Sequence, residues 1–395
     1  MRAQERWRLE ESINLLPSEN VTSPDVRSLL ASDFGHRYTL PTNAEFSGYF
    51  LENSYRGTRI TDEIEQATER LACDVFSADY ACVKPLSGHI AALIVIVSTT
   101  RRGASIASIS AENGGYDGYC KGYISDLFGL RVLHLPFNQK NHNLDTEATV
   151  KLIRSNKPRL VILGASFILF PYDMDQVKEA CEDAASSLVY DASHVLGLVA
   201  GNEFQQPLKE GANILFGSTH KSFFGPQGGL IVTNDQKSFE SIQENLTWKL
   251  VDNAHWNRIA ALGQSLLELK RFGKVYAKQV VKNAQSLGKE LFERDFPIMF
   301  EELGYTKSHQ LLIDHKQVEK LYDCSMNDLS IRLEKSNIII DSVARLGVSE
   351  ITRMGCKERD MSEIAELILY AVKGRNVKKK VKEFRVKLEL SYIFT

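Results

Sequence analysis

A single lysine, Lys221, stands where a side chain could act as a nucleophile. It lies between a histidine and a serine in the segment T-H-K-S-F-F-G-P-Q-G-G at 219–229. The apolar run I-L-F at 214–216 predicts a strand that ends just before it, and the glycines and proline after it predict a tight turn. An amine at a buried strand end loses its proton easily and can attack a carbonyl, so the pattern predicts a Schiff-base lysine. A surface lysine in a hairpin loop is the alternative.

Asp191 and His194 follow an earlier apolar run, L-V-Y at 188–190, which predicts a short buried strand. An acid at the carboxyl end of a parallel strand lies where open α/β sheets bind ligands. A carboxylate against a pyridine nitrogen keeps that ring protonated, and His194 could stack on the ring or hydrogen-bond to it. Taken singly, the acid would be a turn residue and the histidine an ordinary core residue. Together with Lys221 they favour a pyridoxal phosphate site.

Five segments of the chain resemble motifs of the serine hydroxymethyltransferase family, which are fold type I pyridoxal phosphate enzymes. In the family's order they are I-N-L-L-P-S-E-N-V-T-S-P (13–24), P-L-S-G-H-I-A-A-L (85–93), Y-D-A-S-H-V-L-G-L-V-A-G (190–201), S-T-H-K-S-F-F-G-P-Q-G-G (218–229) and R-L-G-V-S-E-I-T-R-M-G (345–355). The resemblance extends through most of the chain. It implies an α/β fold with a mostly parallel central sheet, helices on both faces and a smaller C-terminal α/β domain.

The resemblance implies pyridoxal 5'-phosphate as the cofactor, held by Lys221, with Asp191 protonating its ring nitrogen. The segment at 85–89 leads into an apolar helix whose start would bind the phosphate; an ordinary capped helix is the alternative. Tyr116 stands where the family usually has a stacking histidine, and its π face could do the same; core packing is the alternative. The residues predicted to bind the cofactor are Ser87, Gly88, His89, Tyr116, Ser166, Asp191, His194, Ser218, His220 and Lys221.

Ser18, Ser166 and Arg345 complete the implied pocket. Ser166 follows the apolar run at 160–163 and matches a family serine near the phenolic oxygen of the cofactor. By resemblance, Ser18 lies near the substrate carboxylate and Arg345 forks onto it, a geometry that lysine could not copy. A turn cap for Ser18 and a surface ion pair for Arg345 are the alternatives. The implied substrate is a small α-amino acid.

Tyr38 and Tyr55 match two tyrosines that reach the pocket of the neighbouring subunit in the family. The resemblance therefore implies a homodimer with shared active sites. It places both tyrosines among the catalytic residues, with Lys221, Asp191 and His194.

Three positions depart from the family at its folate-related sites. Leu40 stands where the family has a glutamate that takes part in proton transfer during folate-dependent one-carbon transfer, and a leucine cannot move a proton. Glu45 could supply a carboxylate from another direction; an exposed loop residue is the alternative. Ala111 and Asp117 stand where apolar family residues contact folate. These departures argue against folate dependence.

Two further departures concern the phosphate. Gln227 replaces a frequent family arginine, and the segment at 250–256 replaces a glycine-rich loop that reaches the phosphate of the other subunit. His255 or Asn253 could restore that contact; an exposed loop is the alternative.

The composition excludes several classes of protein. The 395 residues include 48 basic and 50 acidic side chains, a balance that gives no support for nucleic acid or a membrane surface as a partner. The six cysteines lack C-x-x-C spacing, which indicates reduced thiols in a cytoplasmic protein and no metal site. The N-terminus is too charged for a signal peptide, and no apolar run is long enough to span a bilayer.

The chain is expected to divide into an N-terminal arm (1–33), a large cofactor-binding domain (34–272) and a small C-terminal domain (273–395). Helices are predicted at 61–76, 90–98, 172–186 and 257–272, the last bridging to the small domain. A helix with Ser23 as its N-cap and Pro24 at its first position is predicted in the arm. The basic tail at 373–387 and the apolar run at 388–394 indicate a solvated face or a terminal strand.

The sequence therefore predicts a pyridoxal phosphate enzyme that cleaves or forms the Cα–Cβ bond of a β-hydroxy amino acid. Aldolase, transaldolase and hydroxymethyl transfer activities all fit this pattern. Another pyridoxal phosphate reaction on the same scaffold, such as decarboxylation or β-replacement, is an alternative, as is a non-catalytic binding protein. The substrate side chain and the acceptor do not follow from the sequence.

Overall fold

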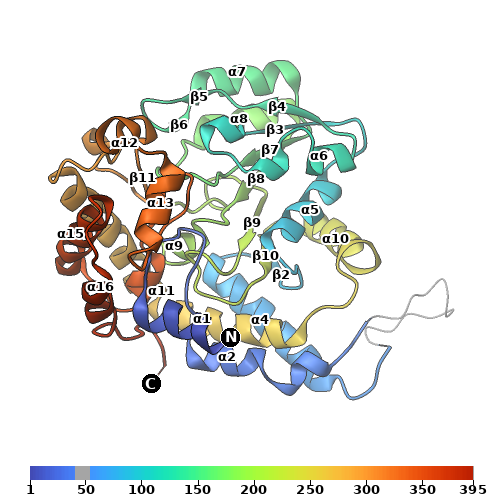
Figure 1. Cartoon of the computed structure of the whole chain (residues 1–395). Helices are drawn as coiled ribbons and strands as arrows, with labels where there is room; N and C mark the ends of the chain where they lie inside the picture. Colours follow the sequence, from blue (N-terminus) through green and yellow to red (C-terminus); the bar gives the residue numbers. More distant parts are fainter. Residues whose placement is uncertain (41–53, 395) are drawn as a thin grey trace.

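The computed structural model describes residues 1–40 and 54–394, and its centre is a seven-stranded sheet in the order β2, β10, β9, β8, β7, β3, β4 (Figure 1). The strands are β2 (Tyr80–Cys82), β3 (Ser105–Ser108), β4 (Arg131–His134), β7 (Leu160–Leu163), β8 (Ser187–Asp191), β9 (Ile214–Ser218) and β10 (Gly229–Thr233). Neighbouring strands are parallel except at β10, which is antiparallel to both β9 and β2. The predicted α/β fold with a mostly parallel sheet is confirmed.

Helices cover both faces of the sheet. Along β3, Ile106 belongs to one apolar core and Ala107 to the other, the alternation expected of a strand buried on both sides. The core around Ile106 includes residues of α5 (Gly88–Thr99) and α10 (Gln236–Asn245). The opposite core includes residues of α4 (Arg59–Phe76), α7 (Thr146–Asn156), α8 (Asp175–Ala184) and α11 (Trp256–Phe292). Short elements complete this part: β5 (Phe137–Asn138), β6 (Asn143–Leu144), α6 (Ile124–Leu127) and α9 (Leu196–Ala200).

The topology brings the chemically interesting segments to one edge of the sheet. Because β8 and β9 are parallel neighbours, their carboxyl ends meet, and Asp191 pairs with Phe216 in their register. Lys221 follows the end of β9 closely. The start of α5 reaches the same edge, since the N–H of Gly229 on β10 donates to the carbonyl of Pro85. An acid, an amine and a helix N-terminus are thus gathered in one place.

The N-terminal arm packs against later parts of the chain. It contains α1 (Arg2–Arg6), the π-helix η1 (Trp7–Glu11), β1 (Ile13–Asn14) and α2 (Pro24–Leu30). Ser23 caps α2 by accepting a hydrogen bond from the Val26 N–H, as predicted. β1 pairs in parallel with β12 (Ile338–Ile339), so the arm joins a strand from the C-terminal part.

The C-terminal part, orange to red in Figure 1, is a group of helices beside a small two-stranded sheet. It contains β11 (Gln310–Leu312), antiparallel to β13 (Arg345–Gly347), and the helices α12 (His315–Tyr322), α13 (Met326–Glu334), α14 (Ser349–Arg353), α15 (Met361–Val372) and α16 (Lys378–Arg385). The basic tail forms α16, and residues 388–394 form no strand. Over residues 1–40 and 54–394, no helix combines the length and the apolar character needed to cross a membrane.

Helix α11 is much longer than the predicted helix at 257–272, because it runs for 37 residues from Trp256 to Phe292. It crosses the expected domain boundary, so the division at 272 stays a prediction. A buried ion pair ties this helix to its neighbours: Glu268 on α11 pairs with Arg353 on α14, and both side chains are 0% exposed. Ser23 of the arm donates a hydrogen bond to the same carboxylate.

Candidate active site

A cavity of about 220 Å³ lies at the carboxyl ends of β8 and β9. All the residues predicted to bind the cofactor line it, namely Ser87, Gly88, His89, Tyr116, Ser166, Asp191, His194, Ser218, His220 and Lys221. Tyr119, Ala165 and Ser193 line it as well. The structure therefore brings together side chains that lie more than 130 positions apart in the sequence.

The Lys221 amine lies 3.2 Å from Nε2 of His194. Burial lowers its pKa to about 8; the Asp191 carboxylate partly opposes this, and the Arg345 guanidinium adds to it. Its backbone is fixed, because the Asn20 amide donates to the Lys221 carbonyl at 2.8 Å and is itself held by the Tyr276 hydroxyl at 2.9 Å. The lysine is thus a positioned amine that loses its proton far more readily than a lysine in water.

Asp191 is held by two donors. The Tyr119 hydroxyl donates to Oδ2 at 2.6 Å, and the backbone N–H of Ser193 donates to Oδ1 at 2.9 Å. Burial, followed by the charge of Asp191, raises the pKa of Tyr119 well above its ordinary value, so this phenol stays a hydrogen-bond donor. The carboxylate is therefore fixed in orientation at the cavity wall.

The start of α5 forms another wall. The Ser87 side chain caps the helix by accepting from the Ile90 N–H at 3.1 Å. The N–H groups of Gly88 and His89, at the first two helical positions, have no acceptor inside the helix. A Cβ at Gly88 would lie 2.1 Å from the Ser218 Oγ, so only glycine lets the helix approach the end of β9 this closely. Free N–H groups at a helix start favour an anion such as a phosphate.

Tyr116 is fixed by contacts on both sides of its ring. Its hydroxyl lies 2.8 Å from Nδ1 of His89, and its ring meets the Tyr119 ring edge-on with centroids 5.2 Å apart. Burial raises the pKa of the Tyr116 hydroxyl, and the charge of Asp191 adds to the effect. The aromatic wall of the cavity is thus held in place independently of any ligand.

The residues present fit pyridoxal phosphate. A reactive amine, a positioned carboxylate and a helix N-terminus line one cavity, as the aldehyde, ring nitrogen and phosphate of that cofactor require. His220 also provides a polar atom that could bind a ligand. Its buried Nδ1 has no hydrogen-bond partner within residues 1–40 and 54–394. Burial and the neighbouring Lys221 lower the pKa of His220 to about 4, so its ring is neutral.

Arg345 and Ser18 lie beside the cavity. The Arg345 side chain donates from Nε to Asp341 at 2.8 Å and from Nη1 to the Ser166 carbonyl at 2.7 Å. It thus contacts Ser166, a residue that lines the cavity. Ser18 lines a second cavity of about 510 Å³, which shares His220 with the first. Each of the two residues predicted to bind substrate is thus connected to the first cavity through one of its lining residues, Ser166 or His220.

Three neighbours of the site were missed in the sequence: Tyr119, His309 and Gln310. The His309 ring stacks on the His194 ring with centroids 5.8 Å apart and planes at 16°, and its Nε2 lies 3.0 Å from the Pro17 carbonyl. Burial lowers the pKa of His309 to about 3. The sequence did contain a signal for two of them. His309 and Gln310 stand directly before the apolar run L-L-I, and buried strands seldom begin with two polar residues.

Tyr38 and Tyr55 lie outside this cavity in the single chain. They are 42% and 44% exposed, and their rings meet edge-on with centroids 5.1 Å apart. The Tyr38 hydroxyl donates to Asp252 at 3.3 Å. Leu40 is 7% exposed, and Glu45 lies outside the described residues. Neither tyrosine is among the residues that line this cavity.

The positions that depart from the family differ in how far they are exposed to solvent. Ala111 and Asp117 are exposed, and the exposed Gln227 lines the second cavity. The segment at 250–256 is not the exposed loop that was the alternative interpretation, because Val251, Ala254 and Trp256 are buried in it. His255 is exposed.

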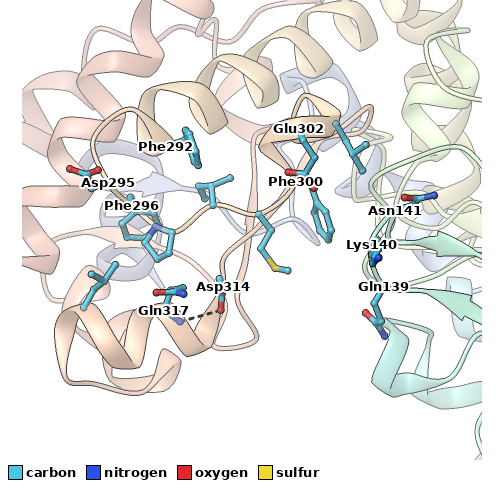
Figure 2. A pocket seen from close by; sticks show the side chains of 15 residues that line it. Gln139, Lys140, Asn141, Phe292, Asp295, Phe296, Phe300, Glu302, Asp314 and Gln317 are labelled. Atoms are coloured by element: carbon cyan, nitrogen blue, oxygen red, sulfur yellow. Dashed lines mark hydrogen bonds between the residues drawn. The ribbon is translucent and has the colours of Figure 1, made fainter.

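A larger cavity of about 1100 Å³ lies elsewhere, between residues 139–141 and the segment from 292 to 321 (Figure 2). Its walls include Phe292, Phe296, Met299 and Phe300, so it is mainly apolar. None of the predicted site residues lines it. The smaller cavity at the sheet edge, which the predicted cofactor-binding residues line, is therefore the candidate active site.

The chain is similar to known protein sequences over most of its length. A family model described as serine hydroxymethyltransferase matches residues 1–368. A serine hydroxymethyltransferase from Methanobrevibacter smithii is 39% identical over 389 residues, which cover 95% of this chain and 90% of that protein. One from Methanocaldococcus jannaschii is 38% identical over 400 residues, which cover 96% of this chain and 91% of that protein.

Among solved structures, the chain is similar to an L-threonine transaldolase from Pseudomonas fluorescens in its internal aldimine state. The TM-score is 0.88 and the sequence identity 25%, and the match covers 100% of this chain and 92% of that one.

Proposed function

Because the chain belongs to the serine hydroxymethyltransferase family, we propose that it is a pyridoxal phosphate enzyme that cleaves or forms the Cα–Cβ bond of a β-hydroxy amino acid. When bound, the cofactor supplies an electron-withdrawing ring that accepts the electron pair left on Cα when that bond breaks. The observation that carries the proposal is the Lys221 amine, positioned 3.2 Å from His194 in a cavity that Asp191 also lines. The transaldolase structure supports the same reaction class.

Each wall of the cavity has a proposed task. Lys221 would bind the cofactor through its amine. Its lowered pKa of about 8 keeps part of this amine neutral, and therefore nucleophilic, at physiological pH. Asp191, oriented by Tyr119, holds a proton on the ring nitrogen. Ser87 and the start of α5 bind the phosphate, and Tyr116 covers one face of the ring.

The substrate is proposed to be a small α-amino acid. Arg345 binds its carboxylate, assisted by Ser18 from the neighbouring cavity, and the cavity volume of about 220 Å³ leaves little room beside a cofactor. The position of Leu40 is filled by a buried apolar side chain that cannot transfer a proton. The acceptor is therefore proposed to be an aldehyde rather than folate.

The proposed functional unit is a homodimer in the cytoplasm, in which Tyr38 and Tyr55 of one subunit complete the site of the other. The exposed position of both tyrosines supports this arrangement, because exposed aromatic side chains often contribute to interfaces. All six cysteines are free thiols, which supports a reducing compartment.

Product analysis tests the reaction. Purified protein with added cofactor is incubated with L-threonine, L-allo-threonine or L-serine, and glycine and aldehyde are measured together. Equal amounts of both are expected from at least one substrate, and no product is expected from Lys221→Ala with an unchanged circular dichroism spectrum. Release of carbon dioxide, or consumption of substrate without glycine, would exclude Cα–Cβ cleavage.

A second measurement tests the acceptor. Glycine formation from L-serine is expected at the same rate with and without tetrahydrofolate, because a folate acceptor would consume the aldehyde and leave glycine as the product to measure. A rate that rises with folate concentration would show that another residue replaces the missing glutamate, and that folate is a substrate.

A further inference from the structure

The side chain of Gln310 joins three parts of the candidate site. It lies at the start of β11 and is 0% exposed. Its Oε1 accepts a hydrogen bond from the Ile168 N–H at 3.1 Å, and its Nε2 donates to the Ser166 carbonyl at 3.1 Å. The same Nε2 lies 2.9 Å from Nδ1 of His194. One amide therefore spans two backbone groups and an imidazole of the cavity wall.

The two backbone groups decide which end of the amide faces His194. A backbone N–H can only donate a hydrogen bond and a backbone carbonyl can only accept one. Turning the amide over would set its NH₂ group against the Ile168 N–H and its oxygen against the Ser166 carbonyl. The NH₂ group must therefore face Nδ1 of His194. Because that group only donates, Nδ1 must accept.

This polarity decides where His194 carries its proton. A neutral imidazole that accepts at Nδ1 carries its hydrogen on Nε2, which here lies 3.2 Å from the Lys221 amine. We propose that Gln310 is a positioning residue that holds His194 in the Nε2–H form, so that His194 donates a hydrogen bond toward Lys221 and the reacting end of the cavity. The inference rests on the proposed function only in naming Lys221 as the reacting amine.

The surroundings of His194 act in the same direction. Burial lowers the pKa of His194 well below its ordinary value. The groups that lower it further are Lys221, Arg345, His309 and His220. An imidazolium would need a hydrogen on Nδ1, where it would meet the Gln310 NH₂ group, and a Lys221 ammonium would meet the Nε2–H donor against donor. Gln310 therefore favours a neutral imidazole together with a neutral amine.

The same amide links His194 to the arginine proposed to bind substrate. The Ser166 carbonyl accepts from Gln310 at 3.1 Å and from Nη1 of Arg345 at 2.7 Å. Both donors come from the small two-stranded sheet, in which β11 pairs with β13. Gln310 thus holds the imidazole in a fixed position relative to the guanidinium.

Nitrogen NMR of the histidine rings tests the proposal. The protein is labelled with ¹⁵N-histidine, freed of cofactor, and compared with His194→Asn to identify the His194 signals among those of nine histidines. At neutral pH and at about pH 5, Nε2 of His194 is expected to carry the hydrogen and Nδ1 to carry none, since its pKa is depressed. A wild-type His194 that carries its hydrogen on Nδ1 would overturn the proposal.

Two substitutions of Gln310 extend the test. A carboxylate can accept where the amide donates, so Gln310→Glu is expected to move the His194 hydrogen to Nδ1. It is also expected to raise the pH at which half of the Lys221 amines condense with added pyridoxal phosphate, by about one to three pH units, because a nearby negative charge stabilises the ammonium. Gln310→Met keeps the length without either polar group, and a mixture of both His194 forms is expected. Two folded variants that keep the wild-type form would contradict the proposal.

Gln205 provides a matched control. It is 4% exposed. Its Oε1 accepts from the Tyr172 N–H at 2.8 Å and from the Tyr190 hydroxyl at 3.0 Å. Its Nε2 donates to the Tyr172 carbonyl at 2.9 Å and to the Glu210 carboxylate at 2.6 Å. Gln205→Met, matched to Gln310→Met, removes a buried amide without setting a carboxylate against Glu210, and it is expected to leave the His194 signals unchanged. A change of the His194 form in this control would show that general loosening, not the Gln310 contact, moves the proton.

The readout separates this inference from the proposed function. The NMR signals need neither cofactor nor turnover. A His194 held in the Nε2–H form, in a protein that cleaves no β-hydroxy amino acid, would refute the proposed reaction and leave the role of Gln310 intact. An active enzyme whose His194 carries its hydrogen on Nδ1 would do the reverse.

Discussion

The cavity around Lys221 and the surface around Tyr38 and Tyr55 differ in how completely one chain builds them. In the cavity, Lys221, Asp191 and His194 each contact a named partner at 3.2 Å or less. The tyrosines are 42% and 44% exposed, and the Tyr38 hydroxyl donates to the exposed Asp252. One region is closed by its own hydrogen bonds, whereas the other presents aromatic side chains to the outside.

The difference indicates which functions a single subunit can perform. Holding the cofactor and setting the protonation of its surroundings need only the buried network. In the proposed homodimer, the substrate-binding part of each site is completed by Tyr38 and Tyr55 of the second copy of the chain. Variants of the buried region should therefore act within each subunit, and variants of the tyrosines should act across subunits.

The largest effect is expected from Asp191→Asn. An amide cannot hold a proton on the ring nitrogen as a carboxylate does, so kcat for Cα–Cβ cleavage should fall about 10²- to 10³-fold, the size typical of a lost charge in an active site. Asp117→Asn, an exposed acid near the same cavity, serves as the control and should retain its rate. Equal losses in both variants would show that the loss does not depend on the carboxylate of Asp191.

A smaller effect is expected from Tyr119→Phe, which removes the 2.6 Å hydrogen bond to Asp191 but keeps the ring. Hydrogen bonds to charged groups contribute about 1.5–3 kcal/mol, so kcat should fall about tenfold or more, with less change in the KM for the amino acid. Tyr123→Phe, at a site 58% exposed, should change neither constant. An unchanged Tyr119→Phe enzyme would show that Asp191 needs no orientation by the phenol.

The pH dependence of cofactor capture is expected to report on Lys221. Its pKa is lowered from 10.5 to about 8, so the reactive neutral amine increases as the pH rises toward 8 and dominates above it. The capture rate of the cofactor-free protein should rise about fivefold between pH 7 and pH 8 and then level off, which absorbance of the bound cofactor can follow. A rate that keeps rising tenfold per unit to pH 10 would mean that the lysine is not buried.

The mixing of two inactive variants tests the exposed region. Lys221→Ala lacks the amine, and Tyr55→Ala lacks one aromatic ring. If subunits share sites, mixed dimers contain one site that keeps both residues. Equal mixing, refolding and assay should then recover up to about a quarter of the wild-type activity. Mixtures no more active than Tyr55→Ala alone would show that each subunit forms its own site.

Local motifs made the buried cavity predictable from sequence. Lys221 and Asp191 each follow a short apolar strand, and parallel strands bring their carboxyl ends to one edge. The helix start at Ser87 to His89 was readable because a turn precedes an apolar run. These features depend on neighbours within a few residues, together with one general rule for parallel sheets.

The supporting contacts depend on long-range packing and were not predictable in this way. Gln310 and His194 are 116 positions apart, and only the folded chain shows that they touch. The predicted helix at 257–272 ended one residue before Gly273, whereas α11 continues to Phe292. In the structure this glycine lies inside α11, and a Cβ at its position would come no closer than 3.4 Å to Leu269, an ordinary contact. Burial of the helix against the rest of the chain outweighs the weak helix preference of one glycine.

The ion pair of Glu268 and Arg353, joined by Ser23, has a consequence for how such a chain can diverge. Either charge alone would be left unpaired in the interior at a cost of about 3–5 kcal/mol, a large fraction of the roughly 5–15 kcal/mol by which native domains are stable. Substitutions at these two positions can therefore accumulate only as a pair. A variant that lost one of the two residues would keep its catalytic side chains but would unfold more often and be degraded by proteases. Loss of activity in a related protein can therefore arise far from the active site.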